Sequence, residues 1–335
     1  MKNWRGMRLS SFPFFAAFAI AAVAPRPLQR SSLQESSFAV HQLSANATIG
    51  GYKDGPICST AGVNDDVRIS VALVTRNRPD SLRRCLESLR AQSAQPFEVV
   101  VCDDSDNGQR DATRAAAEEF RCRWVAGPRR GLYANRNFAA RQCAGTHVRT
   151  MDDDHLFPAE HFAQCLEAVR SDTSAVWSTG EIGFIDGKVY DTAETATQLH
   201  PSGAGGPVHN PDDNWAVADG STIYPAEIFR RGLAMVEDFP WGSAYLEFGA
   251  YAYRHGYRGR CIRGAMVEHH ASPETLTRDL AESRLFASIC FNFYFRRNPA
   301  RAAKYLMSFA MRSPGVSGKF PRMLNMARRR WSAVR

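Results

Sequence analysis

The amino-acid sequence predicts an α/β fold in which a mostly parallel sheet is flanked by helices. Short apolar runs alternate along residues 67–170 with longer stretches of helical periodicity, and such alternation is typical of parallel sheets that are covered on both faces. Two acidic clusters, at residues 103–106 and 152–154, each follow directly after an apolar run. Because ligands of such sheets bind at the carboxyl ends of the strands, the clusters indicate a binding site there.

The elements of this half follow one another in a regular order. We expect strands at residues 69–74, 97–102, 122–125 and 147–151, and helices at 79–89, 109–119, 131–143 and 158–169. The first helix begins at Pro79 and carries leucines at helical spacing. The second half alternates less regularly. There we expect strands at 174–181, at 216–224 and up to 267, helices near 225–233 and 242–255, and a polar excursion at 186–214.

Composition divides the chain into three regions. Residues 1–66 combine an apolar segment with a linker, residues 67–275 form the α/β domain, and residues 276–335 form a basic, aromatic, helical tail. Within residues 1–25, basic residues precede an apolar stretch with a small-x-small ending, which resembles a secretory signal. That stretch is shorter than the roughly 20 residues of a membrane-spanning helix. A membrane-associating segment, or residues outside the mature chain, are the alternatives.

The net charge of +8 is distributed unevenly along the 335 residues. From residue 295 onward there are eleven Lys and Arg residues and no acid, whereas residues 41–294 are net acidic. An acidic body argues against a nucleic-acid-binding core. A basic tail rich in aromatic residues suits an anionic membrane surface. An RNA-binding arm is the alternative, although no RNA-binding motif accompanies the tail. The eight cysteines include no C-x-x-C pair, and we interpret them as buried thiols.

Asp152, Asp153 and Asp154 form a candidate metal site. Three adjacent carboxylates at a buried strand end repel one another unless a cation or hydrogen-bond donors neutralise them. Mn²⁺ and Mg²⁺ take oxygen ligands, and Mg²⁺ commonly links a carboxylate to substrate phosphates. The cluster could instead cap the following helix, but a single Asp suffices for a cap. We therefore expect Mn²⁺ or Mg²⁺ at this strand end.

Other polar residues follow the neighbouring strands. Thr75, Arg76 and Asn77 come after the first strand, Asp104 comes after the second, and Arg136 lies in a helical stretch. Asp at such a junction can accept hydrogen bonds from a nucleoside, and Arg can bind phosphates. Both residue types are also ordinary in turns and on surfaces.

In this order, the motifs resemble the nucleotide-sugar-binding half of family 2 glycosyltransferases, which have the GT-A fold. The resemblance covers ISVALVTRNRPDSLRRCLESLRAQ, FEVVVCDDSDN and GLYANRNFAARQCAGTHVRTMDDDHLFP. It implies that Thr75 and Asp104 contact the base of the nucleotide and that Arg136 also contacts the nucleotide. Asp152 and Asp154 would be the first and last residues of the family's D-x-D motif, which binds the metal and the ribose. The residues expected to bind the nucleotide are Thr75, Arg76, Asn77, Asp104, Arg136, Asp152 and Asp153.

The resemblance extends more loosely into the second half. ADGSTIYPAEIF resembles the segment that lines the acceptor site, and AMVEHH resembles a strand that often ends in a metal-binding His. The expected metal ligands are thus Asp152, Asp154 and His269, with His270 as the alternate to His269.

WGSAYLEFGAYAYRHGYR resembles the helix that usually carries the catalytic base, but the sequence departs from the family there. Ala244 and Tyr245 stand where an acidic pair is common. Because inverting transfer needs a base near the acceptor hydroxyl, Asp238 and Glu247 become the candidate catalytic residues. Alternatively, Asp238 could cap a helix and Glu247 could be a charge on a helix surface.

The resemblance implies an inverting glycosyltransferase that uses a nucleoside-diphosphate sugar, with UDP-sugars favoured. Its acceptor would be a saccharide or a lipid-linked saccharide in cell-surface polysaccharide or glycolipid synthesis. We expect a cytoplasmic protein, peripheral at the inner face of the membrane. Two alternatives stay open. One is a non-catalytic sugar-nucleotide-binding protein of the same fold, and the other is a metal-dependent nucleotidyltransferase, although its G-x-G-T-R opening is absent.

Overall fold

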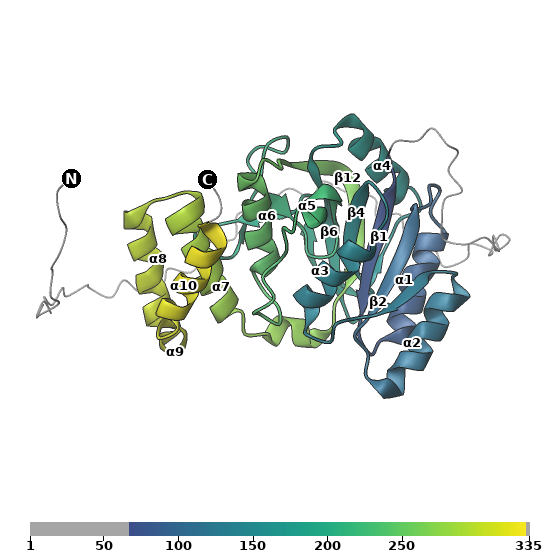
Figure 1. The fold of residues 1–335 in the computed structure, drawn as a ribbon, viewed down its shortest axis with the longest axis horizontal. Helices are drawn as coiled ribbons and strands as arrows, with labels where there is room; N and C mark the ends of the chain where they lie inside the picture. The colour runs from purple at the N-terminus through teal and green to yellow at the C-terminus, as the bar shows by residue number, and fades with distance from the viewer. Residues whose placement is uncertain (1–66, 333–335) are drawn as a thin grey trace, which may run out of the picture. The chain divides into compact units, whose positions relative to one another are not determined.

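The computed structural model describes residues 67–332 (Figure 1). The signal-like segment and the linker expected within residues 1–66 lie outside the described residues. Strands and helices alternate through the first half of the described chain in the expected order. The predicted α/β fold class is therefore confirmed.

A mixed sheet forms the centre of the described chain. Its strands follow the order β3-β2-β1-β4-β11-β6-β12-β5, and β7 pairs with β6 outside this path. These strands are β1 (Ile69–Thr75), β2 (Glu98–Asp103), β3 (Arg123–Ala126), β4 (His147–Asp152), β5 (His155–Leu156), β6 (Val176–Ile185), β7 (Lys188–Ala193), β11 (Thr222–Pro225) and β12 (Gly259–His270). The pairings among β1–β4 and between β6 and β12 are parallel, whereas β5, β7 and β11 pair antiparallel to their neighbours.

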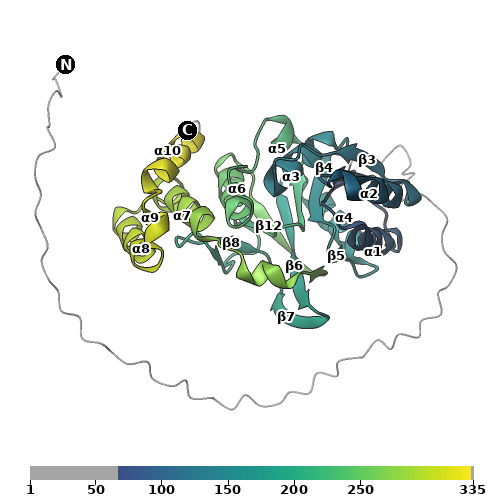
Figure 2. The same ribbon diagram turned by 90° about the horizontal axis from the view of Figure 1, so that it is seen from below.

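Each face of the sheet packs against its own set of helices (Figure 2). Side chains alternate along a strand, so Val71 and Leu73 of β1 join one core while Ala72 and Val74 join the other. Helices α1 (Pro79–Arg90), α2 (Asn107–Glu119) and α4 (His161–Ser171) cover the first face. Helices α3 (Leu132–Gln142), α5 (Glu227–Arg230) and α6 (Ala244–Arg254) cover the second.

Parallel pairing sets the ends of three strands side by side. Thr75 at the end of β1 lies opposite Asp103 of β2. On its other side, Val74 of β1 lies opposite Asp152 of β4. The two acidic clusters therefore meet at one edge of the sheet, as the sequence predicts.

The expected strand at residues 216–224 is two strands in different sheets. β10 (Ala216–Val217) joins a three-stranded sheet with β8 (Thr197–Leu199) and β9 (Gly205–Gly206), whereas β11 belongs to the central sheet. Gly220 breaks the run because its φ of +91° favours glycine. A Cβ atom there would also lie 2.5 Å from the His155 ring. This glycine thus lets the chain turn directly over a residue of the candidate site.

The residues beyond β12 form helices, as expected. They are the 3₁₀-helix η1 (Pro273–Thr277), α7 (Ala281–Ile289), the π-helix η2 (Cys290–Phe295), α8 (Pro299–Arg312), α9 (Pro314–Ser317) and α10 (Phe320–Trp331). None of the helices within residues 67–332 is long and apolar enough to cross a membrane. α10 buries Met323, Ala327 and Trp331 in the same core as α6.

A buried ion pair joins α10 to α6. Arg330 Nε lies 2.7 and 2.8 Å from the two carboxylate oxygens of Glu247, and Trp331 Nε1 donates to Glu247 Oε1 at 2.8 Å. Arg330 also donates to the carbonyl of Ala234. Because the Glu247 side chain is fully buried, these donors satisfy its charge, and the basic tail is anchored to the domain at this point.

Glu247→Gln should lower the free energy of unfolding by about 3 kcal/mol, because it leaves the Arg330 charge buried without a counter-ion. Chemical denaturation followed by circular dichroism measures this change. The matched control is Glu227→Gln on α5, where the residue is exposed and the expected change is within about 0.5 kcal/mol. Equal stability of the two variants would contradict the anchoring role.

Candidate functional site

A cavity of about 570 Å³ lies at the carboxyl edge of the sheet. It extends from the ends of β1 and β2, where Thr75 and Asp104 line it, to the β6–β7 hairpin, where Glu181 and Asp191 line it. Between them lie Asp152, Asp154 and His269, and Trp241, Tyr245 and Arg278 complete the wall. The motifs that the sequence analysis identified from both halves therefore surround one space.

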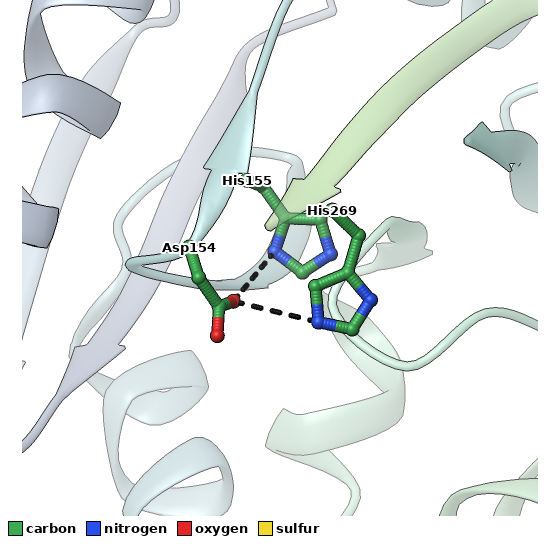
Figure 3. A group of neighbouring side chains, drawn as sticks. All are labelled: Asp154, His155 and His269. Atoms are coloured by element: carbon green, nitrogen blue, oxygen red, sulfur yellow. Dashed lines mark ion pairs between the residues drawn. The ribbon is translucent and has the colours of Figure 1, made fainter. Parts of the chain in front are cut away.

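Asp154, His155 and His269 form a cluster with the geometry of a metal site (Figure 3). Asp154 Oδ1 lies 3.6 Å from His155 Nδ1 and 3.8 Å from His269 Nε2. The two imidazole rings stack with centroids 4.7 Å apart. β5 pairs with β12 so that His155 and His269 are directly opposite each other, and this pairing creates the cluster.

The donor atoms of the cluster fit a divalent cation. Asp154 Oδ1, the oxygen that approaches both imidazole rings, is buried and has no hydrogen-bond partner among the described residues. Carboxylate oxygen suits Mn²⁺ and Mg²⁺, and imidazole suits transition metals. His155 was not among the expected ligands, although it directly follows the acidic run.

Glu181 orients His269. Its Oε1 atom lies 2.7 Å from His269 Nδ1, which leaves the Nε2 atom directed toward Asp154. Such a carboxylate–histidine contact is the usual support of a metal-ligating imidazole. Burial lowers the pKa of His269, but the hydrogen bond and charge of Glu181 outweigh it and raise the pKa to about 8.

The three aspartates occupy different environments. Asp152 pairs with Arg136, whose Nη2 lies 2.5 Å from Asp152 Oδ2, and Arg136 also pairs with Asp219. The Asp152 side chain, expected as a metal ligand, is thus neutralised by a buried guanidinium and lies outside the metal cluster. Arg136 reaches the site, but two carboxylates already bind it.

Asp153, expected to contact the nucleotide, is fully buried and does not line the cavity. Its Oδ2 accepts a hydrogen bond of 2.5 Å from Thr75 Oγ1. Arg78 spans both neighbours, with Nη2 2.6 Å from Asp153 Oδ1 and Nη1 2.8 Å from Asp154 Oδ2. Burial raises the pKa of the Asp153 carboxyl, which Arg78 opposes. Asp153 therefore fixes Thr75 and Arg78 instead of facing a ligand.

The expected nucleoside contacts divide into two groups. Asp104 lines the cavity, and its Oδ1 accepts a hydrogen bond of 2.8 Å from the Arg129 backbone N–H. Arg76 lines the cavity with an exposed side chain. Asn77 does not line it, because its amide group bonds to Asp106 within the turn.

Neither expected catalytic base is brought to the cavity. Glu247 is fully buried and engaged by Arg330 and Trp331, so it cannot meet an acceptor. Asp238 is exposed and is not among the lining residues. Tyr245, at the position of the missing acidic pair, does line the cavity, but burial raises its pKa to about 12. The sequence could not reveal that Glu247 is buried in an ion pair, because its partners Arg330 and Trp331 lie more than 80 residues away.

The chain is similar in sequence to known glycosyltransferases. The model of glycosyl transferase family 2 matches residues 70–233. Chondroitin synthase of Escherichia coli is 28% identical over 110 residues, which cover 32% of this chain and 16% of that protein. The putative glycosyltransferase EpsH of Bacillus subtilis is 28% identical over 130 residues, or 37% of each chain. The chain thus spans well under half the length of these curated relatives.

Solved structures share the fold. S. aureus TarS 1–349 in complex with UDP-GlcNAc superposes with a TM-score of 0.55 at 16% identity, over 79% of this chain and 81% of that chain. GalNAc-T7 with UDP, GalNAc and Mn²⁺ superposes with a TM-score of 0.59 at 14% identity, over 79% and 54%. At these identities the likeness shows a common GT-A fold.

Asp154→Asn should weaken Mn²⁺ binding by more than the roughly 10–100-fold typical of residues that only support a ligand, because it removes the carboxylate charge of the cluster. Isothermal titration calorimetry measures the affinity, and circular dichroism verifies the fold. Asp111→Asn, on the exposed surface of α2, is the matched control. Unchanged Mn²⁺ affinity in Asp154→Asn would refute the metal site.

Proposed function

Because the chain belongs to glycosyl transferase family 2, we propose that it transfers a sugar from a nucleoside-diphosphate sugar to a hydroxyl group, with inversion. One observation carries this proposal. A single cavity joins the strand-end residues Thr75 and Asp104 to the cluster of Asp154, His155 and His269. A nucleoside at the first group and a diphosphate at the second would place the sugar toward the β6–β7 hairpin.

The residues of the cluster would hold Mn²⁺ in preference to Mg²⁺. Two imidazoles and one carboxylate suit a transition metal, whereas Mg²⁺ prefers oxygen ligands and near-ideal octahedral geometry. The bound cation would stabilise the negative charge that develops on the departing diphosphate. The Mn²⁺ in the GalNAc-T7 structure supports this choice.

The donor we propose is a UDP-sugar, and the acceptor is a saccharide. TarS binds UDP and UDP-GlcNAc in its crystal structures, and GalNAc-T7 was solved with UDP. Two exposed aromatic side chains, Trp241 and Tyr190, line the cavity beyond the metal cluster. Aromatic rings combine an apolar face with a polar edge, which suits the two faces of a sugar ring. The chondroitin synthase relative also supports a role in polysaccharide synthesis.

The test is release of UDP from a panel of UDP-sugars that includes UDP-GlcNAc, followed with a coupled assay. We expect release in the presence of Mn²⁺, loss with EDTA, and weaker activity with Mg²⁺. Restoration of activity by Mn²⁺ after chelation is the control. Release that is unaffected by EDTA would contradict the metal-dependent mechanism.

A non-catalytic sugar-nucleotide-binding protein is the second candidate. Ala244 and Tyr245 favour it because they supply no carboxylate at the usual position of the base. Such a protein would show a thermal shift with UDP-sugars and Mn²⁺. It would release no UDP from any donor, with or without saccharide acceptors.

We also propose that α8 binds an anionic membrane surface. One face of α8 exposes Met307 and Met311, at 61% and 78% relative accessibility, together with the alanines at 300, 303 and 310. Exposed basic residues flank this face: Arg297, Lys304 and Arg312. An apolar stripe bordered by basic residues is typical of helices that lie in the membrane interface. This placement would bring the enzyme close to a lipid-linked acceptor.

The double variant Met307→Ser and Met311→Ser should bind more weakly to vesicles that contain phosphatidylglycerol, because it lacks the apolar surface that inserts into the membrane. Sedimentation with vesicles measures the bound fraction, and pure phosphatidylcholine vesicles should bind little of either protein. Val189→Ser removes an apolar residue that is similarly exposed on β7 and serves as the control. Binding of the double variant equal to the wild type, or a wild type that forms dimers through this face, would contradict the proposal.

A further inference from the structure

The proposed transfer needs a group that takes the proton of the acceptor hydroxyl, and the usual family position holds Ala244 and Tyr245. The assignment of this group rests on the proposed function. Among the described residues, six carboxylates line the cavity: Asp104, Asp152, Asp154, Glu181, Asp191 and Asp219. A base must face the acceptor and be free of a competing cation.

Three of the six are engaged in ion pairs that leave no free base. Asp152 and Asp219 share the buried guanidinium of Arg136. Asp154 pairs with Arg78 and belongs to the metal cluster. The guanidinium groups of Arg136 and Arg78 neutralise the charges of these carboxylates.

Two further carboxylates are also committed. Glu181 lies 2.7 Å from His269 and orients it. Asp104 receives the backbone N–H of Arg129 and lies after β2, at the proposed nucleoside side of the cavity. Among the described residues, Asp191 forms no ion pair with Lys, Arg or His, and its Oδ1 accepts only the backbone N–H of its neighbour Thr192, at 2.9 Å. Within residues 67–332, Asp104 is also without an ion pair, so its place at the nucleoside side of the cavity, away from the β6–β7 hairpin, is what separates it from Asp191.

Pairing within the β6–β7 hairpin places Asp191 near the metal cluster. Asp191 lies opposite Gly183, and Ala193 lies opposite Glu181. Residues two apart on a strand share a face, so Asp191 and Glu181 are diagonal neighbours on one face, with Cα atoms about 7–8 Å apart. Glu181 contacts His269 of the metal-site cluster. The Glu181 side chain therefore lies between Asp191 and this cluster. Asp191 is exposed, and the hairpin that carries it extends past the rest of the sheet (Figure 2).

Tyr190 lines the same cavity as Glu181, Asp191 and Asp154. Burial raises the pKa of its phenol, and the charges of Glu181, Asp191 and Asp154 act in the same direction. A Cβ atom on Gly183 would lie 2.6 Å from the Tyr190 ring. The absence of a side chain on Gly183 thus makes room for the Tyr190 ring against β6.

We propose that Asp191 is the general base. Its carboxylate accepts the proton of the acceptor hydroxyl while the hydroxyl oxygen forms a bond to the anomeric carbon. The bond from that carbon to the diphosphate oxygen breaks, and the nucleoside diphosphate leaves with the electron pair. The β6–β7 hairpin thereby supplies the function that the start of α6 lacks.

Asp191→Asn tests this role, because Asn keeps the shape of the side chain and cannot accept the proton. The probe is Mn²⁺-dependent release of UDP from whichever UDP-sugar the wild type cleaves, with water in place of the acceptor hydroxyl. We expect kcat to fall about 100-fold or more, while the affinity for UDP with Mn²⁺ stays unchanged. Asp191→Glu should restore part of the activity.

The matched control is Asp186→Asn, which removes the same charge from the turn of the same hairpin, outside the cavity. It should keep the wild-type kcat. An Asp191→Asn variant that is as active as Asp186→Asn would overturn the assignment while leaving the proposed function intact. A wild type that releases no UDP from any donor would instead refute the proposed function, and the assignment of Asp191 with it.

Discussion

The pairing of β5 with β12 joins two residues that are 114 positions apart in the chain, His155 and His269. Strand pairing of this kind fixes the distance between opposite residues to about 5 Å, so the two imidazoles stack beside the carboxylate of Asp154. Glu181 comes from β6, the other neighbour of β12, and holds His269 in place. The candidate metal site thus depends on the alignment of three strands around one carboxylate.

Adjacent residues in this site have different roles because the strand end turns each of them toward different partners. Asp152 faces the buried Arg136, Asp153 lies in the protein interior with Thr75 and Arg78, and Asp154 faces the two histidines. Arg136 pairs with Asp152, and Arg78 pairs with Asp153 and with Asp154 Oδ2, which lowers the mutual repulsion of the three carboxylates. Asp154 Oδ1 is left to meet a cation together with His155 and His269.

The sequence predicted the first half of the fold well because local patterns determine it. Apolar runs, helical spacing and strand-end acids placed Thr75, Asp104 and Asp154 at one edge. The sequence patterns gave wrong predictions where residues distant in the chain determine the structure. Arg330 and Trp331 bury Glu247. Gly220 divides one apparent strand, because the turn packs on His155.

The central claim is that Asp154 and His269 bind a divalent cation that also contacts the diphosphate of the donor. Crystals of the full chain grown with UDP and Mn²⁺, measured near the manganese absorption edge, test it most directly. We expect an anomalous peak within about 2.0–2.4 Å of an Asp154 oxygen and His269 Nε2, in contact with UDP phosphate oxygens. A peak beside Asp152 and Asp153 without His269, or UDP bound in the cavity with no anomalous peak, would contradict it.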